Sequence, residues 1–270
     1  MDKTIISRQL KNAYKRLNHK EYKSPYKYKL KKGKQILYFF GSRHSYNPKD
    51  VQFVELRDFW DDFQKNVSGP YEVLIEGGKR SNKFKDEIEA IKKEGELGLV
   101  YFLGKKAGVK IDSPDLSDRD WFNGLAKIFN RDFVAYYDFI RVAYQWNRTD
   151  KSISFKKYAS SFLKQNEKSV HWKDFDFSLK NMQRIHKELF KTPFDENDQN
   201  FLVSLLDVNS DKSVINEISR YDDEGFRDLK IIDNISKEWS KKLSLFIIFG
   251  APHAIVMRDI LKKIVGGGAK

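Results

Sequence analysis

The sequence LSLFIIFGAPH, residues 243–253, contains the longest apolar run of the chain, and that run ends at Gly250. An apolar run of this length bounded by a turn residue is typical of a strand buried on both faces of a parallel sheet. The same layout occurs near the start of the chain, where residues 35–44 read QILYFFGSRH and the apolar run ends at Gly41. The two stretches therefore predict two central strands, each followed by a glycine turn that leads to a histidine.

Further strands and helices are predicted around these two stretches. Between residues 35 and 115, apolar runs over 35–40, 71–75 and 109–111 alternate with segments of helical periodicity. A strand–helix–strand order of this kind is typical of a parallel sheet whose strands are joined by crossover helices. We therefore predict an α/β fold with a mostly parallel sheet.

The middle of the chain has a different pattern. Residues 116–224 are rich in aromatic residues at helical spacing and contain few strand signals, so we expect a helical insertion there. Residues 225–265 then form a closing helix, strand and helix, the last of these over 255–264. Together with a basic segment at 1–34 and the first α/β part at 35–115, we expect a single compact domain overall.

Composition excludes several classes of protein. The chain has 270 residues, which is enough to bury a core, and it contains no cysteine. Disulfide scaffolds, cysteine-ligated metals and cysteine nucleophiles are therefore excluded. No apolar run is long enough for a membrane span, and no signal-peptide pattern follows the basic N-terminus. We expect a cytoplasmic protein with no membrane partner.

Most of the net charge of +13 comes from residues 1–34, which contain twelve Lys and Arg residues and only two acids. Tyrosines lie among these lysines, so the segment could bind nucleic acid by pairing with phosphates and stacking on bases. The alternation of Tyr and Lys over residues 26–30 instead predicts a half-exposed strand whose lysines face water. We favour the strand and keep nucleic-acid binding as an alternative function.

Polar residues follow the predicted strands: His44, Glu76, His253 and, after the third strand, Asp112 and Asp115. The carboxyl ends of parallel strands meet at one edge of the sheet, which is where open α/β sheets bind ligands. Two imidazoles and a carboxylate can hold a Mn, Fe or Zn ion, so His44, His253 and Glu76 are candidate metal ligands. Without a metal, the same groups can perform general acid–base chemistry.

Three motifs follow one another along the chain: Gly41-Ser42-Arg43-His44, Glu76-Gly77-Gly78 and Gly250-Ala251-Pro252-His253. In this order they resemble the TraB/TIKI superfamily, which includes the erythromycin-esterase and ChaN-like proteins. The superfamily pattern is two Gly-x-x-His motifs, an intervening Glu and a late Arg, which Arg227 matches. Further support comes from Gly95-Glu96-Leu97-Gly98 and residues 109–115. The resemblance covers roughly residues 35–115 and 225–260.

The resemblance implies that His44 is a metal ligand or general base, with His253 as its partner. It implies that Glu76 positions water or the base, and that Arg227 binds a substrate carboxylate or stabilises developing negative charge. Further candidates for substrate binding are Arg43, Glu96, Asp112 and Asp115.

Members of this superfamily resemble metal-dependent peptidases, esterases that need no metal, or haem-binding proteins. The implied function is a hydrolase that acts on a peptide or ester bond of a peptide or small-molecule substrate. The alternative within the superfamily is a protein that binds haem or a metal without catalysis, because one fold can host several functions.

Overall fold

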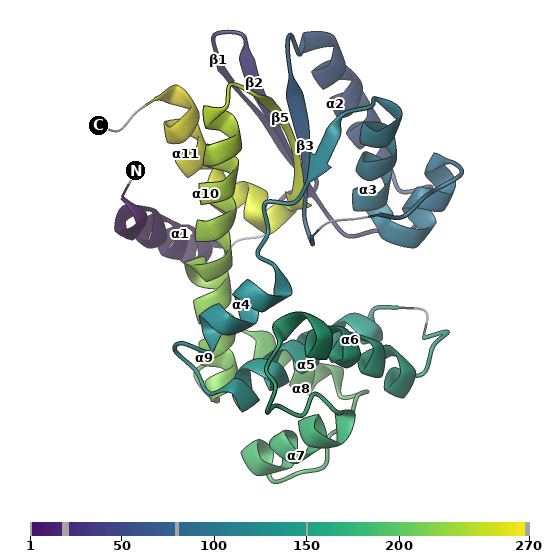
Figure 1. Ribbon diagram of the computed structural model, residues 1–270, viewed down its shortest axis with the longest axis vertical. Coiled ribbons are helices and arrows are strands. Elements are labelled where there is room, and N and C mark those ends of the chain that lie inside the picture. The colour runs from purple at the N-terminus through teal and green to yellow at the C-terminus, as the bar shows by residue number, and fades with distance from the viewer. Residues whose placement is uncertain (1, 18–21, 79–80, 150, 268–270) are drawn as a thin grey trace. The chain divides into compact units, whose positions relative to one another are not determined.

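The computed structural model describes residues 2–17, 22–78, 81–149 and 151–267 (Figure 1). Residue contacts divide the chain into two units; one is Met1–Asp115 together with Gly225–Lys270, and the other is Leu116–Glu224. The sequence predicts a single compact domain, whereas the chain divides at both ends of the segment predicted to be a helical insertion.

The first unit is built on a five-stranded sheet with the strand order β1-β2-β5-β3-β4. The strands are β1 (Tyr26–Lys32), β2 (Gln35–Ser42), β3 (Tyr71–Ile75), β4 (Lys110–Asp112) and β5 (Ser244–Gly250). β1 and β2 form an antiparallel hairpin, and the three other pairings are parallel. This confirms the predicted α/β fold with a mostly parallel sheet. β5, from the end of the chain, lies between β2 and β3.

The side chains of the central strands alternate between two apolar clusters, one on each face of the sheet. Leu37 and Phe39 of β2 belong to one cluster together with Ile247 of β5. Tyr38 and Phe40 of β2 belong to the other cluster. Because successive strand residues point to opposite faces, a strand covered on both faces needs an uninterrupted apolar run. That requirement explains the two runs from which the fold was predicted.

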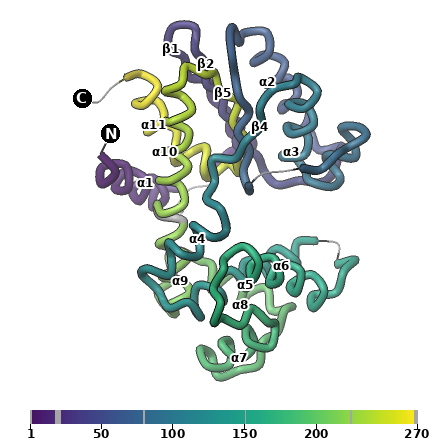
Figure 2. The backbone as a smooth tube through the Cα atoms, in the orientation of Figure 1, coloured from purple at the N-terminus to yellow at the C-terminus, as the bar shows by residue number. Residues whose placement is uncertain are grey.

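Helices cover both faces of this sheet (Figure 2). The cluster that contains Phe40 is covered by α2 (Gln52–Asn66) and α3 (Glu87–Lys106). The opposite cluster is covered by α1 (Lys3–Leu17), α10 (Arg227–Ser240) and α11 (Ala251–Gly266). Crossover helices on both faces are therefore present, as the strand–helix order predicts.

The last helix begins earlier than the sequence predicts. α11 starts at Ala251 rather than at residue 255. Pro252 lies in its first turn, where a residue without a backbone N–H is tolerated because that group would have no partner within the helix. His253 is therefore a residue of the first helical turn and not of a preceding loop.

The second unit is helical, as expected for residues 116–224. Its helices are α4 (Asp118–Leu125), α5 (Arg131–Asn147), α6 (Phe155–Val170), α7 (Leu179–Phe190), α8 (Gln199–Leu206) and α9 (Val214–Tyr221). A short π-helical segment, Asp222–Phe226, follows α9 in the chain. Tyr136 of α5 is completely buried, and its hydroxyl lies 2.6 Å from Nδ1 of His186. Burial lowers the pKa of His186, so this imidazole is a neutral packing residue at pH 7.

Two lysines of β1, Lys27 and Lys29, are exposed and pair with acids. Lys27 lies 2.8 Å from the carboxylate of Glu55, and Lys29 lies 2.6 Å from that of Asp62; both acids are on α2. The half-exposed strand predicted over residues 26–30 is present within β1. These pairings favour the interpretation of the β1 lysines as a solvated sheet face over a nucleic-acid surface.

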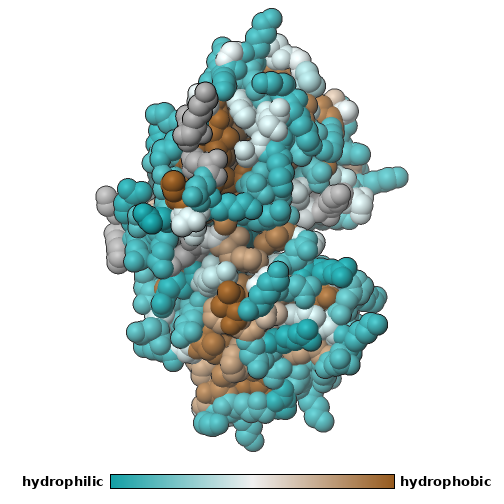
Figure 3. Space-filling model, turned by 60° about the vertical axis from the view of Figure 1, so that its left-hand side comes forward, coloured by the Kyte–Doolittle hydropathy of each residue, from teal (hydrophilic) through white to brown (hydrophobic). Residues whose placement is uncertain are grey.

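Apolar side chains lie mainly inside each unit. The face drawn in Figure 3 is mostly hydrophilic, and hydrophobic residues show between the hydrophilic ones. None of the helices in the described part of the chain combines the length and the hydropathy required to cross a bilayer.

Gly41 allows α11 to approach the end of β2 closely. A Cβ atom on Gly41 would lie 2.6 Å from Cβ of Ala254 and 2.9 Å from Cα of Ala251. Both distances are shorter than van der Waals contact, so no other residue fits without moving the first turn of α11. Because His253 is in that turn, Gly41 fixes the position of the histidine relative to the sheet.

We expect Gly41→Ala to destabilise the first unit by about 1–3 kcal/mol, the usual cost of overpacking a close contact. Urea unfolding measures this change. Gly266→Ala is the control, because a Cβ at Gly266 has nothing within 4 Å. Equal unfolding midpoints for the two variants would contradict the close contact.

Candidate active site

The parallel strands of the first unit end at one edge of the sheet. Ser42 of β2 pairs with Gly250 of β5, and Ile75 of β3 pairs with Ile248 of the same strand. The side chains that follow these strand ends therefore emerge close to one another. This is the edge at which the sequence predicts a ligand site.

His44 follows β2 and is paired with Glu96 of α3. Nδ1 of His44 lies 2.7 Å from Oε1 of Glu96, and the hydroxyl of Ser42 donates to the same oxygen at 2.9 Å. Glu96 is 2% exposed, whereas the side chain of His44 is 48% exposed. A buried carboxylate acts as the acceptor here, so Nδ1 is the donor, and Nε2 lies on the Gly250 side of the ring.

Glu96 reaches His44 because α3 is broken just before it. Glu94 and Gly95 have non-helical backbone angles, which divide α3 into two helical parts. Gly95 has φ +61°, and a Cβ there would lie 2.7 Å from the carbonyl oxygen of Ser45. Glycine is thus required both by its backbone conformation and by the approach of the loop that carries His44. Sequence reasoning assigned Glu96 to substrate binding, whereas the structure makes it the partner that orients His44.

Gly250 leaves a small hollow between His44 and Glu76. A Cβ atom on Gly250 would lie 3.6 Å from Nε2 of His44 and 3.7 Å from Oε2 of Glu76. These are ordinary van der Waals distances, so both side chains border a space the size of a methyl group. The backbone N–H of Gly250 donates to Oε2 of Glu76 at 2.7 Å and holds the carboxylate in place.

Arg227 binds two carboxylates that follow neighbouring strands. Its Nε and Nη2 donate to the two oxygens of Asp115, each at 2.7 Å, and Nη2 also donates to Oε1 of Glu76 at 3.1 Å. Burial acts to raise the pKa of Glu76 and of Asp115. The charges of Arg227 and His253, together with the hydrogen bonds that each carboxylate accepts, outweigh burial, and both pKa values lie below their usual range. Both carboxylates are therefore ionised at pH 7.

His253 is held by a second buried carboxylate. Its Nδ1 lies 2.8 Å from Oδ1 of Asp228, which is 1% exposed, and its Nε2 lies 3.8 Å from Oε1 of Glu76. Burial acts to lower the pKa of His253. The charge of Asp228 and its hydrogen bond outweigh burial and raise the pKa to about 9. His253 is therefore a cation at neutral pH. Glu76 lies between the imidazoles of His253 and His44.

The structure adds two residues that sequence reasoning missed, Tyr14 and Asp228. The hydroxyl of Tyr14 donates to Oδ2 of Asp228 at 2.6 Å and lies 3.4 Å from Nδ1 of His253. Asp228 could have been found as the immediate neighbour of Arg227. Tyr14 belongs to the apolar stripe of α1 with Leu10, so its spacing alone indicates packing.

The two other candidates, Arg43 and Asp112, pair with neighbouring side chains. Arg43 is exposed and donates to Asp50 at 2.6 Å, so its charge is directed to that acid. Asp112 lies on β4, 3.6 Å from Nζ of Lys110, and accepts a hydrogen bond from the N–H of Ser113. The structure connects the other candidates through contacts at the strand ends; these are His44, Glu76, Glu96, Asp115, Arg227 and His253.

The donor set does not fit a metal ion. Arg227 and the cationic His253 already lie against Glu76, and an imidazole that is protonated at both ring nitrogens offers no lone pair to a metal. Within the described residues, no group of three or more His, Asp or Glu side chains is arranged to hold a metal ion. Two cations compensate three carboxylates here, and the charges of the cluster nearly balance without a metal.

Comparisons of the chain with protein-family models, with curated proteins and with solved structures find no match. The resemblance stated above therefore depends on the order and placement of its motifs alone.

We expect the imidazole of His253 to titrate near pH 9 in an NMR pH titration. Because its pKa is raised from 6.5, the interaction stabilises the folded state below pH 6.5 and is lost as the pH rises through about 9. Asp228→Asn removes the main source of the shift and lowers the midpoint, whereas Asp50→Asn, which removes the partner of Arg43, leaves it unchanged. A wild-type midpoint at or below 6.5 would contradict the buried ion pair.

Proposed function

We propose that this protein hydrolyses esters by general acid–base catalysis, with His44 as the base. The proposal depends above all on one observation: Nδ1 of His44 is 2.7 Å from the buried Glu96, which leaves Nε2 facing Glu76 and Gly250. An imidazole in this tautomer can take a proton at Nε2 at neutral pH.

The hollow beside Gly250 is the proposed position of the attacking water. A water there would donate one hydrogen to Glu76, whose carboxylate is ionised, and the other to Nε2 of His44. As the oxygen bonds to the ester carbon, its proton passes to His44. The bond from that carbon to the alcohol oxygen then breaks, and His44 returns the proton to the leaving alkoxide.

Arg227 and His253 supply the positive charge for this reaction. Negative charge develops on the carbonyl oxygen during attack, and preorganised cations stabilise it best in a site of low water content. Arg227 is 18% exposed and His253 is 15% exposed, so the two are largely withdrawn from solvent. With a pKa of about 9, His253 stays protonated through the neutral range and acts as an electrostatic group rather than as a base.

An ester is the substrate that this donor set suits best. Alkoxide is a better leaving group than the amide nitrogen of a peptide, and a site without a Lewis acid polarises the carbonyl less strongly. The same motifs resemble the esterase members of the TraB/TIKI superfamily, which need no metal. We therefore propose the esterase branch, and not the peptidase or haem-binding branches, as the function to test first.

The test is hydrolysis of p-nitrophenyl butyrate by the full chain after removal of metals with a chelator. We expect His44→Ala to lower kcat/KM by at least about 100-fold, the range found for general bases. Glu96→Gln keeps the imidazole but loses the carboxylate that fixes its tautomer, so we expect a smaller loss. Both variants should remain folded, since His44 is half-exposed and glutamine has nearly the size of glutamate.

The matched control is His171→Asn. His171 is an exposed histidine with φ +60° at the end of α6, and asparagine tolerates that conformation. It should leave kcat/KM unchanged. An ester hydrolysis rate that His44→Ala does not reduce would refute the proposal, as would activity that appears only when Zn or Mn is added.

A further inference from the structure

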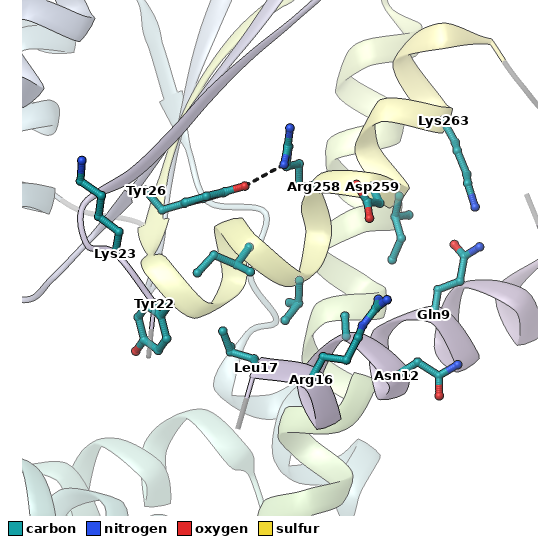
Figure 4. Close-up of a pocket in the computed structure, with 14 residues that line it drawn as sticks. Gln9, Asn12, Arg16, Leu17, Tyr22, Lys23, Tyr26, Arg258, Asp259 and Lys263 are labelled. Atoms are coloured by element: carbon teal, nitrogen blue, oxygen red, sulfur yellow. Dashed lines mark hydrogen bonds between the residues drawn. The ribbon is translucent and has the colours of Figure 1, made fainter. Parts of the chain in front are cut away.

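A groove of about 570 Å³ lies between α1, α11 and the start of β1 (Figure 4). The face of α1 that lines it carries Gln9 and Arg16, which are seven residues apart and thus on one side of a helix. Figure 4 shows both side chains directed from α1 toward α11, and Lys263 directed from α11 toward α1. The groove has the volume of a typical small-molecule site.

The groove is lined by more positive than negative charge. Its cations are Arg16, Lys23, Arg258 and Lys263, and its acid is Asp259. Within the described part of the chain, the structure gives no ion pair to Arg16, Lys23 or Lys263, unlike Lys27 and Lys29 of β1, which pair with acids of α2. Cations from two helices facing one space form a binding surface for phosphate oxygens.

The groove also offers hydrogen-bond acceptors. The side-chain oxygen of Gln9 is buried and has no hydrogen-bond partner among the described residues. Asp259 adds a carboxylate on the opposite side. An unpartnered buried acceptor costs free energy, and a ligand with N–H or O–H groups would remove that cost. A carboxylate in such a place commonly accepts hydrogen bonds from the hydroxyls of a ribose.

Apolar and aromatic surface completes the lining. Ala13 and Leu17 of α1 and Ile260 of α11 border the groove. At its other end, the hydroxyl of Tyr26 accepts a hydrogen bond from Arg258 at 3.1 Å, which fixes the ring at the rim. The groove therefore combines cations, acceptors and a surface for a planar apolar ring, three features that phosphate alone does not require.

We propose that this groove binds a nucleoside phosphate. Arg16 and Lys263 bind its phosphates, Gln9 and Asp259 accept hydrogen bonds from its ribose or base, and the base packs on the apolar lining. The phosphate chemistry is shared with the backbone of a nucleic acid. The volume of about 570 Å³ favours a single nucleotide over a strand.

Isothermal titration calorimetry of the full chain in low-salt buffer tests the proposal with ATP, adenosine, inorganic tripolyphosphate and a single-stranded oligoadenylate. We expect saturable ATP binding at one site per chain, at least tenfold tighter than binding of adenosine or tripolyphosphate. The double variant R16A/K263A should weaken ATP binding at least tenfold. The matched control K27A/K29A removes the same charge from β1 and should leave the affinity within twofold.

Each other outcome overturns the proposal. Absence of saturable ATP binding removes the site, and equal weakening by both double variants makes the binding a non-specific effect of net charge. Tripolyphosphate that binds as tightly as ATP reduces the groove to a phosphate site, and an oligoadenylate that binds tenfold tighter than ATP makes it a nucleic-acid site. All four substituted residues are exposed, so thermal melting should show that both variants remain folded.

Discussion

The guanidinium of Arg227 is the group on which the strand-end site depends. It joins the start of α10 to Asp115 after β4 and to Glu76 after β3, with Nη1 3.4 Å from Nε2 of His253. The side chains of Asp115 and Glu76 are only 6% and 12% exposed, and a carboxylate withdrawn from water without a partner is far more costly than one held by a bidentate guanidinium. Arg227 thus keeps the carboxylates ionised and close together. The position of Glu76 then determines the position of the hollow beside Gly250.

The two histidines of the repeated Gly-x-x-His pattern have opposite electrostatic environments. His44 is half-exposed and directs Nε2 to the hollow, whereas His253 is enclosed by Asp228, Glu76 and Arg227 and is held as a cation. Titratable groups whose environments differ in this way are the usual means of dividing base and charge-stabilising roles within one site. The glycines of the two motifs have matching structural roles, since Gly41 admits the first turn of α11 and Gly250 leaves space beside His44.

Short sequence patterns predicted the sheet and much of the site, because these features depend on residues that are close together in the sequence. Apolar runs that end in glycine gave the central strands, and parallel pairing then placed His44, Glu76 and His253 at one edge. Sequence alone missed Tyr14 and Asp228 and did not pair Glu96 with His44, because these contacts are tertiary and join α1, α3 and α10 to the strand ends. It also named His44, His253 and Glu76 as candidate metal ligands beside a metal-free alternative, because a count of donors does not reveal that Arg227 already binds Glu76.

A double-mutant cycle on Arg227 and Asp115 tests the central role of the guanidinium most directly. Urea unfolding of Arg227→Met, Asp115→Asn and the double variant gives their coupling energy. The account predicts that each single change costs about 3–5 kcal/mol, and that the double change costs clearly less than their sum, because neither group is then left buried without its partner. Two small and additive losses, each below about 1 kcal/mol as for an exposed ion pair, would contradict it.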